Sequence, residues 1–442
     1  MSVPAQLPQR RILGLIFLTV LMDIIGFSIL LPLFPSLLDH YIKTEGVQGT
    51  LIGVLSTLAE LIGGPPAFKA VLFGGLLSSL YSLLQFVFSP IWGALSDRYG
   101  RRGILTITLA GNALSYLVWV FAAQFWMVVL TRCICGMMAG NIAVASAAAA
   151  DITDEKDRMK GMAVVGVAIG MGFLIGPVIG GFSSNIKPIY TANPFSTSAL
   201  IAATMAGLNF ILVKLYFPET LKEKNRALHD AKRPSIFDLA NVKSVAVRRT
   251  SWANLLYQIA FTGMENTVMF LTFFLFAYSA HENAYVFLFN GACLITAQGL
   301  ARLIVKKIGQ RGVVILGMVI AIAGFSIVAF IPAPHVGLTI AGWVKPIFYL
   351  GMGLLSFATG LILPSVSSLV SLYSGSSEQG RNLGILRSAG SLARAIGPIC
   401  AAILYFKTGT HQWVYIAGAL LMLPALWVIR GLPEPVIHRE SH

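Results

Sequence analysis

Charged side chains are scarce in this chain, and the shortage excludes an ordinary soluble protein. Only 11% of its 442 residues are charged, whereas 56% are hydrophobic and the mean hydropathy is +0.77. A soluble domain carries about 25% charged residues. Because a soluble fold of this size cannot bury so much apolar surface, the composition predicts a polytopic membrane protein.

Cysteine is also scarce, which excludes a disulfide framework. All four cysteines fall inside long apolar runs: Cys133, Cys135, Cys293 and Cys400. Because Cys-Ile-Cys within a helix is also a poor metal site, we interpret all four as packing residues. The Gly-x-x-x-x-Gly-Lys-(Ser/Thr) loop that binds ATP phosphates is missing. No set of serine, histidine and acid converges within the apolar runs. We therefore predict no metal, no cofactor and no enzymatic activity.

The positive net charge, +14, comes from basic residues spread over the connections between apolar runs. Because they are not gathered on one polar domain, nucleic acid is not a predicted partner. If both termini and the central polar segment are cytoplasmic, nearly all basic residues fall on the cytoplasmic side, including Arg10, Arg102 and Lys307. This asymmetry predicts that both ends of the chain are cytoplasmic, in either a plasma or an organelle membrane.

About twelve apolar runs are long enough to cross a bilayer, which takes ~20 apolar residues per helix. The first covers residues 12–38 and the fourth residues 125–149. We predict an all-α membrane protein with twelve transmembrane helices. It would consist of an N-terminal six-helix half (1–217), a cytoplasmic central loop (218–251) and a C-terminal six-helix half (252–442).

The two predicted halves share weak internal similarity. Ile175-Gly176-Pro177 in the fifth run has a counterpart in Ile396-Gly397-Pro398 in the eleventh. Related six-helix halves imply a pseudo-two-fold axis, with a substrate site between the halves near the bilayer midplane.

Two acidic residues lie deep in apolar runs, Asp23 in the first and Glu265 in the seventh. An ionised group at the bilayer centre costs about 2.5–3.5 kcal/mol on insertion scales, so each needs a reason. Proton coupling requires an acid that can be both neutral and charged. The alternative is a polar clamp between packed helices, and for both residues the two interpretations stay open.

Buried arginines provide the complementary charge. Arg132 lies in the fourth run, and Arg394 lies in the eleventh, seven residues after Arg387 and on nearly the same helix face. An arginine stays charged, so it can steer the protonation of an acid or bind an anionic solute. With Asn141 and Asn266, Arg132 and Arg394 form the candidate substrate-binding set. For Arg132, snorkelling to the membrane surface is the alternative.

Several stretches resemble a known family, including the part of the fourth run that contains Arg132. The loop between the second and third runs matches the signature of the major facilitator superfamily of transporters at every defining position: Gly93, Asp97, Arg98, Gly100, Arg101 and Arg102. The first run resembles helix 1 of tetracycline-resistance-like drug/proton antiporters, a group that includes eukaryotic tetracycline-transporter-like proteins associated with organic-anion efflux. The fifth run resembles a motif found more in exchangers than in symporters, formed by Gly172, Gly176, Pro177, Gly180 and Gly181.

This resemblance implies the major facilitator fold and a role for each motif. Asp23 falls on the helix 1 acid implicated in transport, and Arg132 falls on an arginine linked to proton transfer. The signature loop is implied to be a conformational latch that holds the two halves together on the cytoplasmic side. The glycine motif of the fifth run implies antiport.

We therefore expect a monomeric secondary transporter that moves a small organic solute and protons in opposite directions by alternating access. Asp23 and Glu265 would carry protons, with Arg132 biasing them, and an organic anion is the favoured solute. Two alternatives stay open. One is a proton symporter or facilitator for a polar metabolite, and the other is a non-transporting membrane scaffold or receptor.

Overall fold

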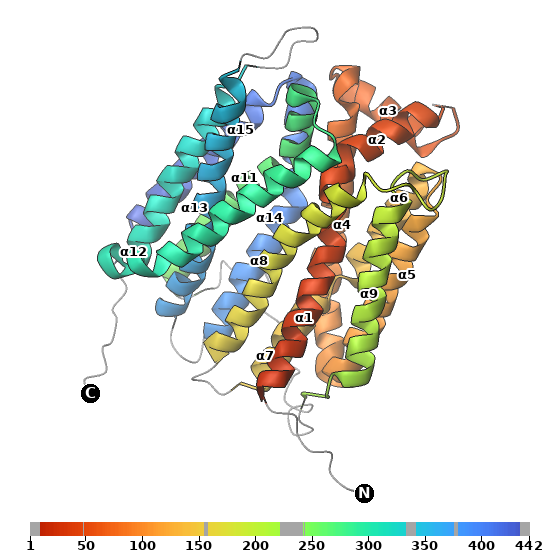
Figure 1. The fold of residues 1–442 in the computed structure, drawn as a ribbon. Helices are drawn as coiled ribbons and strands as arrows, with labels where there is room; N and C mark the ends of the chain where they lie inside the picture. Colours follow the sequence, from red (N-terminus) through yellow and green to blue (C-terminus); the bar gives the residue numbers. More distant parts are fainter. Residues whose placement is uncertain are drawn as a thin grey trace, which may run out of the picture. The chain divides into compact units, whose positions relative to one another are not determined.

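The computed structural model describes residues 9–46, 48–153, 158–221, 242, 244–332, 342–374 and 379–433 (Figure 1). Every regular element within these ranges is helical, and twelve stretches are long and apolar enough to cross a membrane. The predicted all-α fold with twelve transmembrane helices is thus confirmed. Most of the predicted central loop, residues 222–241 and 243, lies outside the described ranges.

The described helices form two groups along the chain. The first group comprises α1 (Gln9–Ser28), α2 (Phe34–Thr44), α3 (Leu51–Ile62), α4 (Lys69–Tyr99), α5 (Arg101–Val120), α6 (Phe125–Met138), α7 (Asn141–Asp151), α8 (Arg158–Ser183) and α9 (Ser196–Tyr216). The second group comprises α11 (Val245–Phe276), α12 (Ala280–Ala329), α13 (Val344–Leu372), α14 (Gln379–Thr408) and α15 (Gln412–Arg430). Two short 3-10 helices, Leu31–Leu33 and Pro66–Phe68, precede α2 and α4.

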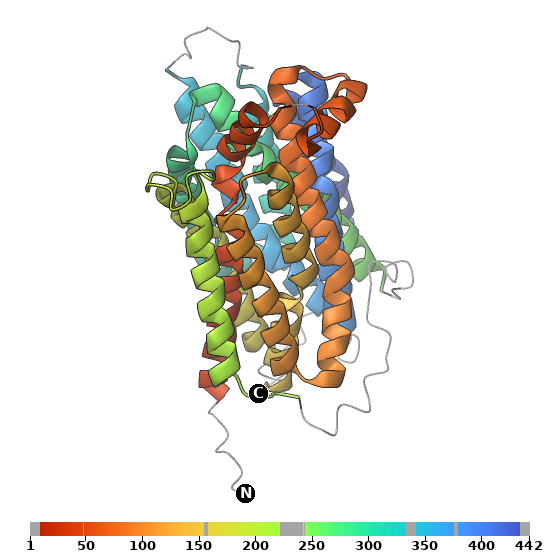
Figure 2. The ribbon, with the colours of Figure 1, turned by 90° about the vertical axis from the view of Figure 1, so that its right-hand side faces the viewer.

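The chain divides into two compact units. Unit 1 consists of Met1–Gly53, Leu83–Lys232 and Ser279–Ala284, and unit 2 consists of Val54–Ser82, Arg233–Tyr278 and Tyr285–His442. Within unit 1, α1 packs against α8 and α5 packs against α9, and Figures 1 and 2 both show α5 and α9 side by side. Within unit 2, α11 packs against α14 and α15.

Two of the predicted continuous spans are broken in the middle. The first changes from α1 to a 3-10 turn and then to α2 where Pro32 and Pro35 remove backbone donors. The fourth is interrupted between α6 and α7 at Ala139 and Gly140, and a side chain on Gly140 would press on Trp92. Each break leaves backbone groups outside the regular helical ladder, close to the buried polar residues described below.

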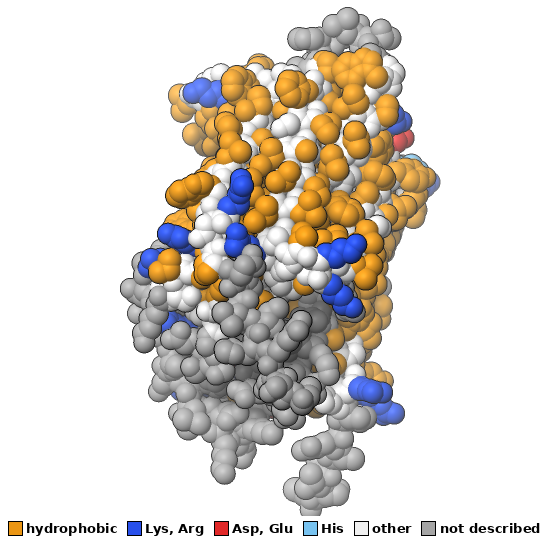
Figure 3. All heavy atoms as spheres, turned by 90° about the vertical axis from the view of Figure 1, so that its left-hand side faces the viewer, with side chains coloured by type: hydrophobic (Ala, Val, Ile, Leu, Met, Phe, Trp, Pro, Cys, Tyr) orange, Lys and Arg blue, Asp and Glu red, His pale blue; other side chains and the backbone are white. Residues whose placement is uncertain are grey.

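The outer surfaces of the spans are apolar. Leu208 and Leu215 on α9, and Leu420 and Trp427 on α15, are among many large hydrophobic side chains exposed along the helices. Figure 3 shows hydrophobic side chains covering most of the described part of one face. Such surfaces are stable against lipid rather than water, in agreement with twelve membrane spans.

Candidate functional site

Asp23 is held by two asparagines from other helices of unit 1. Its Oδ1 accepts hydrogen bonds from Asn112 Nδ2 on α5 and from Asn141 Nδ2 on α7, both at 2.9 Å. The Thr108 hydroxyl donates in turn to the Asn141 side-chain oxygen. Both amide donors bind the same carboxylate oxygen, Oδ1. The structure brings together Asp23 and Asn141, which the sequence singled out, and adds Asn112, which it did not.

Arg132 is buried in the same unit, with 2% of its surface exposed. Its neighbour one turn along α6, Cys135, interacts electrostatically with both Arg132 and Asp23, and the Cys135 sulfur lies 3.1 Å from the Ser115 hydroxyl. A side chain that snorkels to the membrane surface would be exposed at its charged end. The burial of Arg132 therefore argues against the snorkelling alternative.

Unit 2 contains a second pair of opposite charges. Glu265 on α11 and Arg394 on α14 interact electrostatically, without a salt bridge within 4.0 Å among the described residues. Arg394 Nη2 donates to the Ser391 hydroxyl at 3.1 Å, and Tyr81 on α4 is a further electrostatic neighbour. Each unit thus has an acid and an arginine on membrane spans that are distant in the sequence; Arg132 is buried, and Asp23, Glu265 and Arg394 are partly buried.

Asn266 lies next to Glu265 and has an unused donor. Its side-chain oxygen accepts a hydrogen bond from the Ser78 hydroxyl at 2.7 Å. Its buried Nδ2 has no partner within the described part of the chain. Leaving a buried donor unsatisfied costs about 1–3 kcal/mol, which makes this amide a candidate contact for a bound solute.

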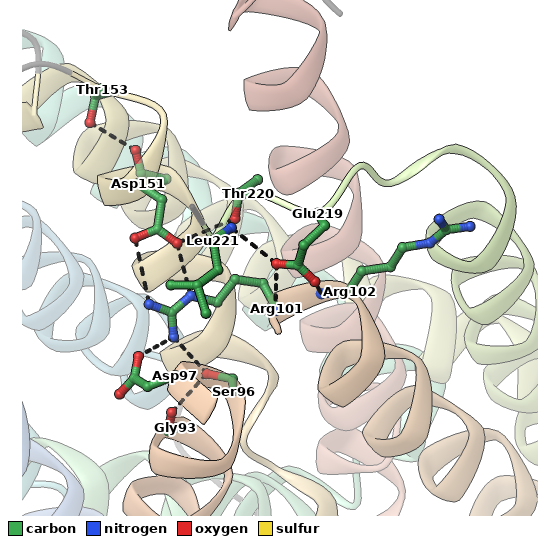
Figure 4. Close-up of polar contacts among 11 residues, drawn as sticks. Gly93, Ser96, Asp97, Arg101, Arg102, Asp151, Thr153, Glu219, Thr220 and Leu221 are labelled. Carbon is green, nitrogen blue, oxygen red and sulfur yellow. Dashed lines mark hydrogen bonds and ion pairs between the residues drawn. The ribbon is translucent and has the colours of Figure 1, made fainter. Parts of the chain in front are cut away.

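The signature loop is organised around Arg101 rather than Asp97 (Figure 4). The Arg101 side chain is only 3% exposed and forms ion pairs with Asp97 and with Asp151 at the end of α7, the latter with Nε 2.8 Å from a carboxylate oxygen. Its Nη1 also donates to the Ser96 hydroxyl at 2.7 Å, and this hydroxyl donates to the Gly93 carbonyl. One guanidinium therefore fixes the ends of α4 and α7 relative to the start of α5.

Glu219, just after α9, caps the first turn of α5. Its carboxylate accepts hydrogen bonds from the backbone N–H groups of Arg101 at 2.8 Å and Arg102 at 3.3 Å (Figure 4). An acid at a helix N-terminus is stabilised by the free N–H groups there. Gly100 has φ 99° and ψ 151°, and a side chain on it would collide with the Glu219 carboxylate. The sequence pattern of the loop does not include Glu219, although the position of this acid shortly after a span is typical of a capping residue.

Not every predicted latch residue joins this network. The Arg98 guanidinium lies over the Tyr99 ring, 5.4 Å from its centroid, on the exposed side. The Arg102 side chain points away from Arg101 and donates to the backbone carbonyl of Lys214 on α9 at 2.5 Å (Figure 4). The structure thus joins Gly93, Asp97, Arg101 and the Gly100 and Arg102 backbones, and leaves two arginine side chains outside.

The glycines of α8 allow it to lie directly on α1. Side chains on Gly172, Gly176 and Gly180 would meet Ile24, Ser28 and the Ile29 carbonyl, and one on Gly181 would meet Ala280. The Ser28 hydroxyl lies 3.0 Å from the Gly172 carbonyl oxygen. Pro177 lies within the helix among these contacts. The motif therefore produces close backbone contact with α1, the helix that carries Asp23.

Comparison with known proteins identifies a transporter family that matches most of the chain. Residues 16–354 and 335–442 match the Major Facilitator Superfamily profile. The chain is 31% identical to Major facilitator superfamily domain-containing protein 10 of Mus musculus, over 98% of this chain and 95% of the relative. It is 27% identical to the class B tetracycline resistance protein of Escherichia coli, over 90% of each chain.

Among solved structures, the crystal structure of the human organic anion transporter MFSD10 (TETRAN) aligns with a TM-score of 0.74 and 31% identity. The alignment covers 96% of this chain and all of that one. The resemblance inferred from the sequence motifs is confirmed, and these relatives are transporters rather than enzymes. The chain is a multi-pass membrane transporter that belongs to the Major Facilitator Superfamily.

Proposed function

We propose that this transporter couples the efflux of a small organic solute to proton movement in the opposite direction, by alternating access. The observation that carries the proposal is the position of Asp23. One of its oxygens is fixed by two asparagine amides, and the other would carry the proton. Ionisable residues inside membrane spans mark proton and substrate pathways.

The surroundings of Asp23 balance its two protonation states. The amide donors of Asn112 and Asn141 stabilise the ionised form by hydrogen bonding. We propose that Arg132, which is buried in the same unit, acts in the same sense through its permanent positive charge. Removal from water opposes these effects. A carboxyl group under such opposing influences can load and release a proton when the conformation of the protein changes.

We propose an organic anion as the solute. Arg132, which is buried, and Arg394, which is partly buried, supply positive charge on membrane spans, and Asn266 supplies an unpaired amide donor beside Glu265. An arginine and an amide together match a carboxylate group. The similarity to the human organic anion transporter supports the same class, while the similarity to tetracycline resistance proteins supports efflux.

We further propose that the Arg101 network acts as a conformational latch in the monomeric protein, with both termini cytoplasmic. One buried guanidinium with two carboxylate partners is stable only as an intact set, since removing one member leaves a buried charge unpaired. Such a set favours a single arrangement of the loop over intermediate ones.

The test is proton and solute flux in liposomes that contain the purified protein under an imposed pH gradient. Lipophilic anions, cations and neutral drugs are added in turn. We expect protons to move opposite to an anion, and Asp23→Asn to abolish the coupled movement. Asp39→Asn, which removes an exposed carboxylate paired with Lys43, is the matched control and should transport normally. Solute uptake without proton movement would overturn the coupling role of Asp23.

One observation favours a second candidate, proton symport of an anion. In unit 2, ionised Glu265 and an anionic solute would compete for the same Arg394. Protonation of Glu265 would free Arg394, so the proton and the anion would bind together and travel in the same direction. The flux experiment separates the two candidates by the direction of proton movement. Glu265→Gln should retain anion binding under symport and lose its pH dependence.

A further inference from the structure

The seam between α5 and α9 on the outside of unit 1 is hollowed. A groove of about 340 Å³ is lined by six apolar residues: Ala110, Ala113, Leu114, Leu117, Ala203 and Phe210. This volume is at the lower end of the range for ligand pockets, about 300–1,000 Å³. Figures 1 and 2 show these two helices running side by side, and the six lining residues come from both of them.

The groove faces away from the packed interior of its unit. α5 and α9 contribute other residues, such as Leu105, Leu109 and Val213, to the hydrophobic core. On the groove side, Leu114 is 58% exposed and Leu117 is 46% exposed. Because these helices are membrane spans, the groove opens to the hydrocarbon of the bilayer, and its small alanines leave space that a hydrocarbon chain can fill.

Two cationic side chains lie at one end of this groove. The Lys214 ammonium lies over the ring of Phe210, 5.5 Å from its centroid, and Phe210 lines the groove. Arg102 donates to the Lys214 carbonyl, and Figure 4 shows its side chain directed away from the Arg101 network. Lys214 is in the last turn of α9 and Arg102 is in the first turn of α5, so both lie where the spans end, at the depth of lipid headgroups.

We propose that an anionic phospholipid of the surrounding bilayer occupies this site. One acyl chain would lie in the α5–α9 groove, and the phosphate would be bound between Lys214 and Arg102. The apolar groove corresponds to the acyl chain of such a lipid, and the ammonium and guanidinium at its end correspond to the phosphate. Arginine and lysine are the phosphate-binding side chains of proteins. The lipid would lie next to the Glu219 cap, since the Arg102 backbone donates to Glu219.

The charge complementarity favours a lipid over a protein partner. A protein that fitted a narrow groove would need an apolar side chain followed directly by an acid, whereas every anionic phospholipid carries both groups. The site lies within one unit and does not depend on the proposed proton coupling.

The experiment measures lipid retention on the purified full-length protein by native mass spectrometry. Phosphatidylglycerol and phosphatidylcholine with identical acyl chains are titrated separately. We expect one phosphatidylglycerol to bind more tightly than phosphatidylcholine. Lys214→Gln should weaken phosphatidylglycerol about fivefold, which is the ~1 kcal/mol typical of one basic residue near an anionic surface, and leave phosphatidylcholine unchanged.

Lys345→Gln is the matched control, because the Lys345 ammonium also lies over an aromatic ring, Tyr278 at 5.3 Å, outside the groove. It should retain phosphatidylglycerol like the wild type. Ala203→Leu should fill the groove and weaken both lipids, and Ala113→Leu serves the same purpose if the first variant does not fold. Equal binding of the two lipids, or an unchanged affinity in Lys214→Gln, would overturn the proposal. Competition by inorganic phosphate alone would assign the site to a free anion instead.

Discussion

Replacing Gly100 by alanine tests whether the Glu219 cap holds the signature loop. Gly100 has φ 99° and ψ 151°, a region of backbone space that is essentially restricted to glycine. Forcing another residue into such a conformation costs about 1–3 kcal/mol. The added methyl group would also displace the Glu219 carboxylate from the N–H groups of Arg101 and Arg102.

The expected loss combines these two effects. Because Glu219 is exposed, we assign about 1 kcal/mol to its hydrogen bonds, within the usual range for a net contribution. Gly100→Ala should therefore lower the free energy of unfolding by about 2–4 kcal/mol. The measurement is a titration with denaturing detergent, followed by the loss of helical circular dichroism.

Three further variants make the test specific. Gly103→Ala is the matched control: a side chain there meets no atom within 4 Å, and alanine is the better helix former by about 1 kcal/mol. It should be neutral or stabilising. Glu219→Gln and the double variant with Gly100→Ala complete a double-mutant cycle. Strict additivity of the two changes, or a loss no larger than in the control, would refute the reasoning.

Three other variants test separate parts of the molecule. Arg394→Lys keeps the positive charge but loses the planar guanidinium group, so the protein should bind an organic anion about tenfold more weakly in titration calorimetry. An unchanged affinity would show that other residues recognise the anion. The side chain of Gly176→Ala would collide with Ser28 on α1, so this variant should destabilise the protein by about 1–3 kcal/mol and impair transport. Gly170→Ala, which has open space around the new side chain, should do neither. Equal effects of the two variants would disprove the contact between α8 and α1. Burial lowers the pKa of His411, in the connection before α15, from 6.5 to about 4, although nearby carbonyl groups partly oppose this. The neutral, buried imidazole contributes fully to the free energy of unfolding above pH 6.5, and this contribution is lost as the pH falls toward 4. Over this interval the free energy of unfolding of the wild type should therefore fall by about 3 kcal/mol more than that of His411→Gln. An equal pH dependence of the two proteins would contradict the lowered pKa of His411.

The spans and their candidate acids could be predicted without coordinates because the membrane imposes strong constraints on a sequence. A helix needs a long apolar run to cross it, and a charge within such a run is conspicuous because it is costly. Asp23, Glu265 and Arg132 stood out for this reason alone. The loop from Gly93 to Arg102 stood out by its sequence pattern, and comparison with known proteins confirmed the family.

The partners of these residues were decided by the tertiary structure. Asn112 and Asn141 are 89 and 118 residues from Asp23, and no local pattern pairs them with it; Asn141 was a candidate residue from the sequence, whereas Asn112 was not. Arg101 and Glu219 are likewise joined by the packing of α5 and α9, and Arg98 is left out of the network although the pattern includes it.

The break in the first span lies at Pro32 and Pro35, and the break in the fourth lies at Gly140, which contacts Trp92 closely. A hydropathy profile does not detect either feature. Hydropathy reports how each residue partitions into a bilayer, and this property belongs to single segments. Pairing depends on which helix faces meet, and this depends on the shapes of all side chains together. The sequence by itself therefore determined the number of spans and which buried groups are functional candidates, and the folded chain determined which groups act together.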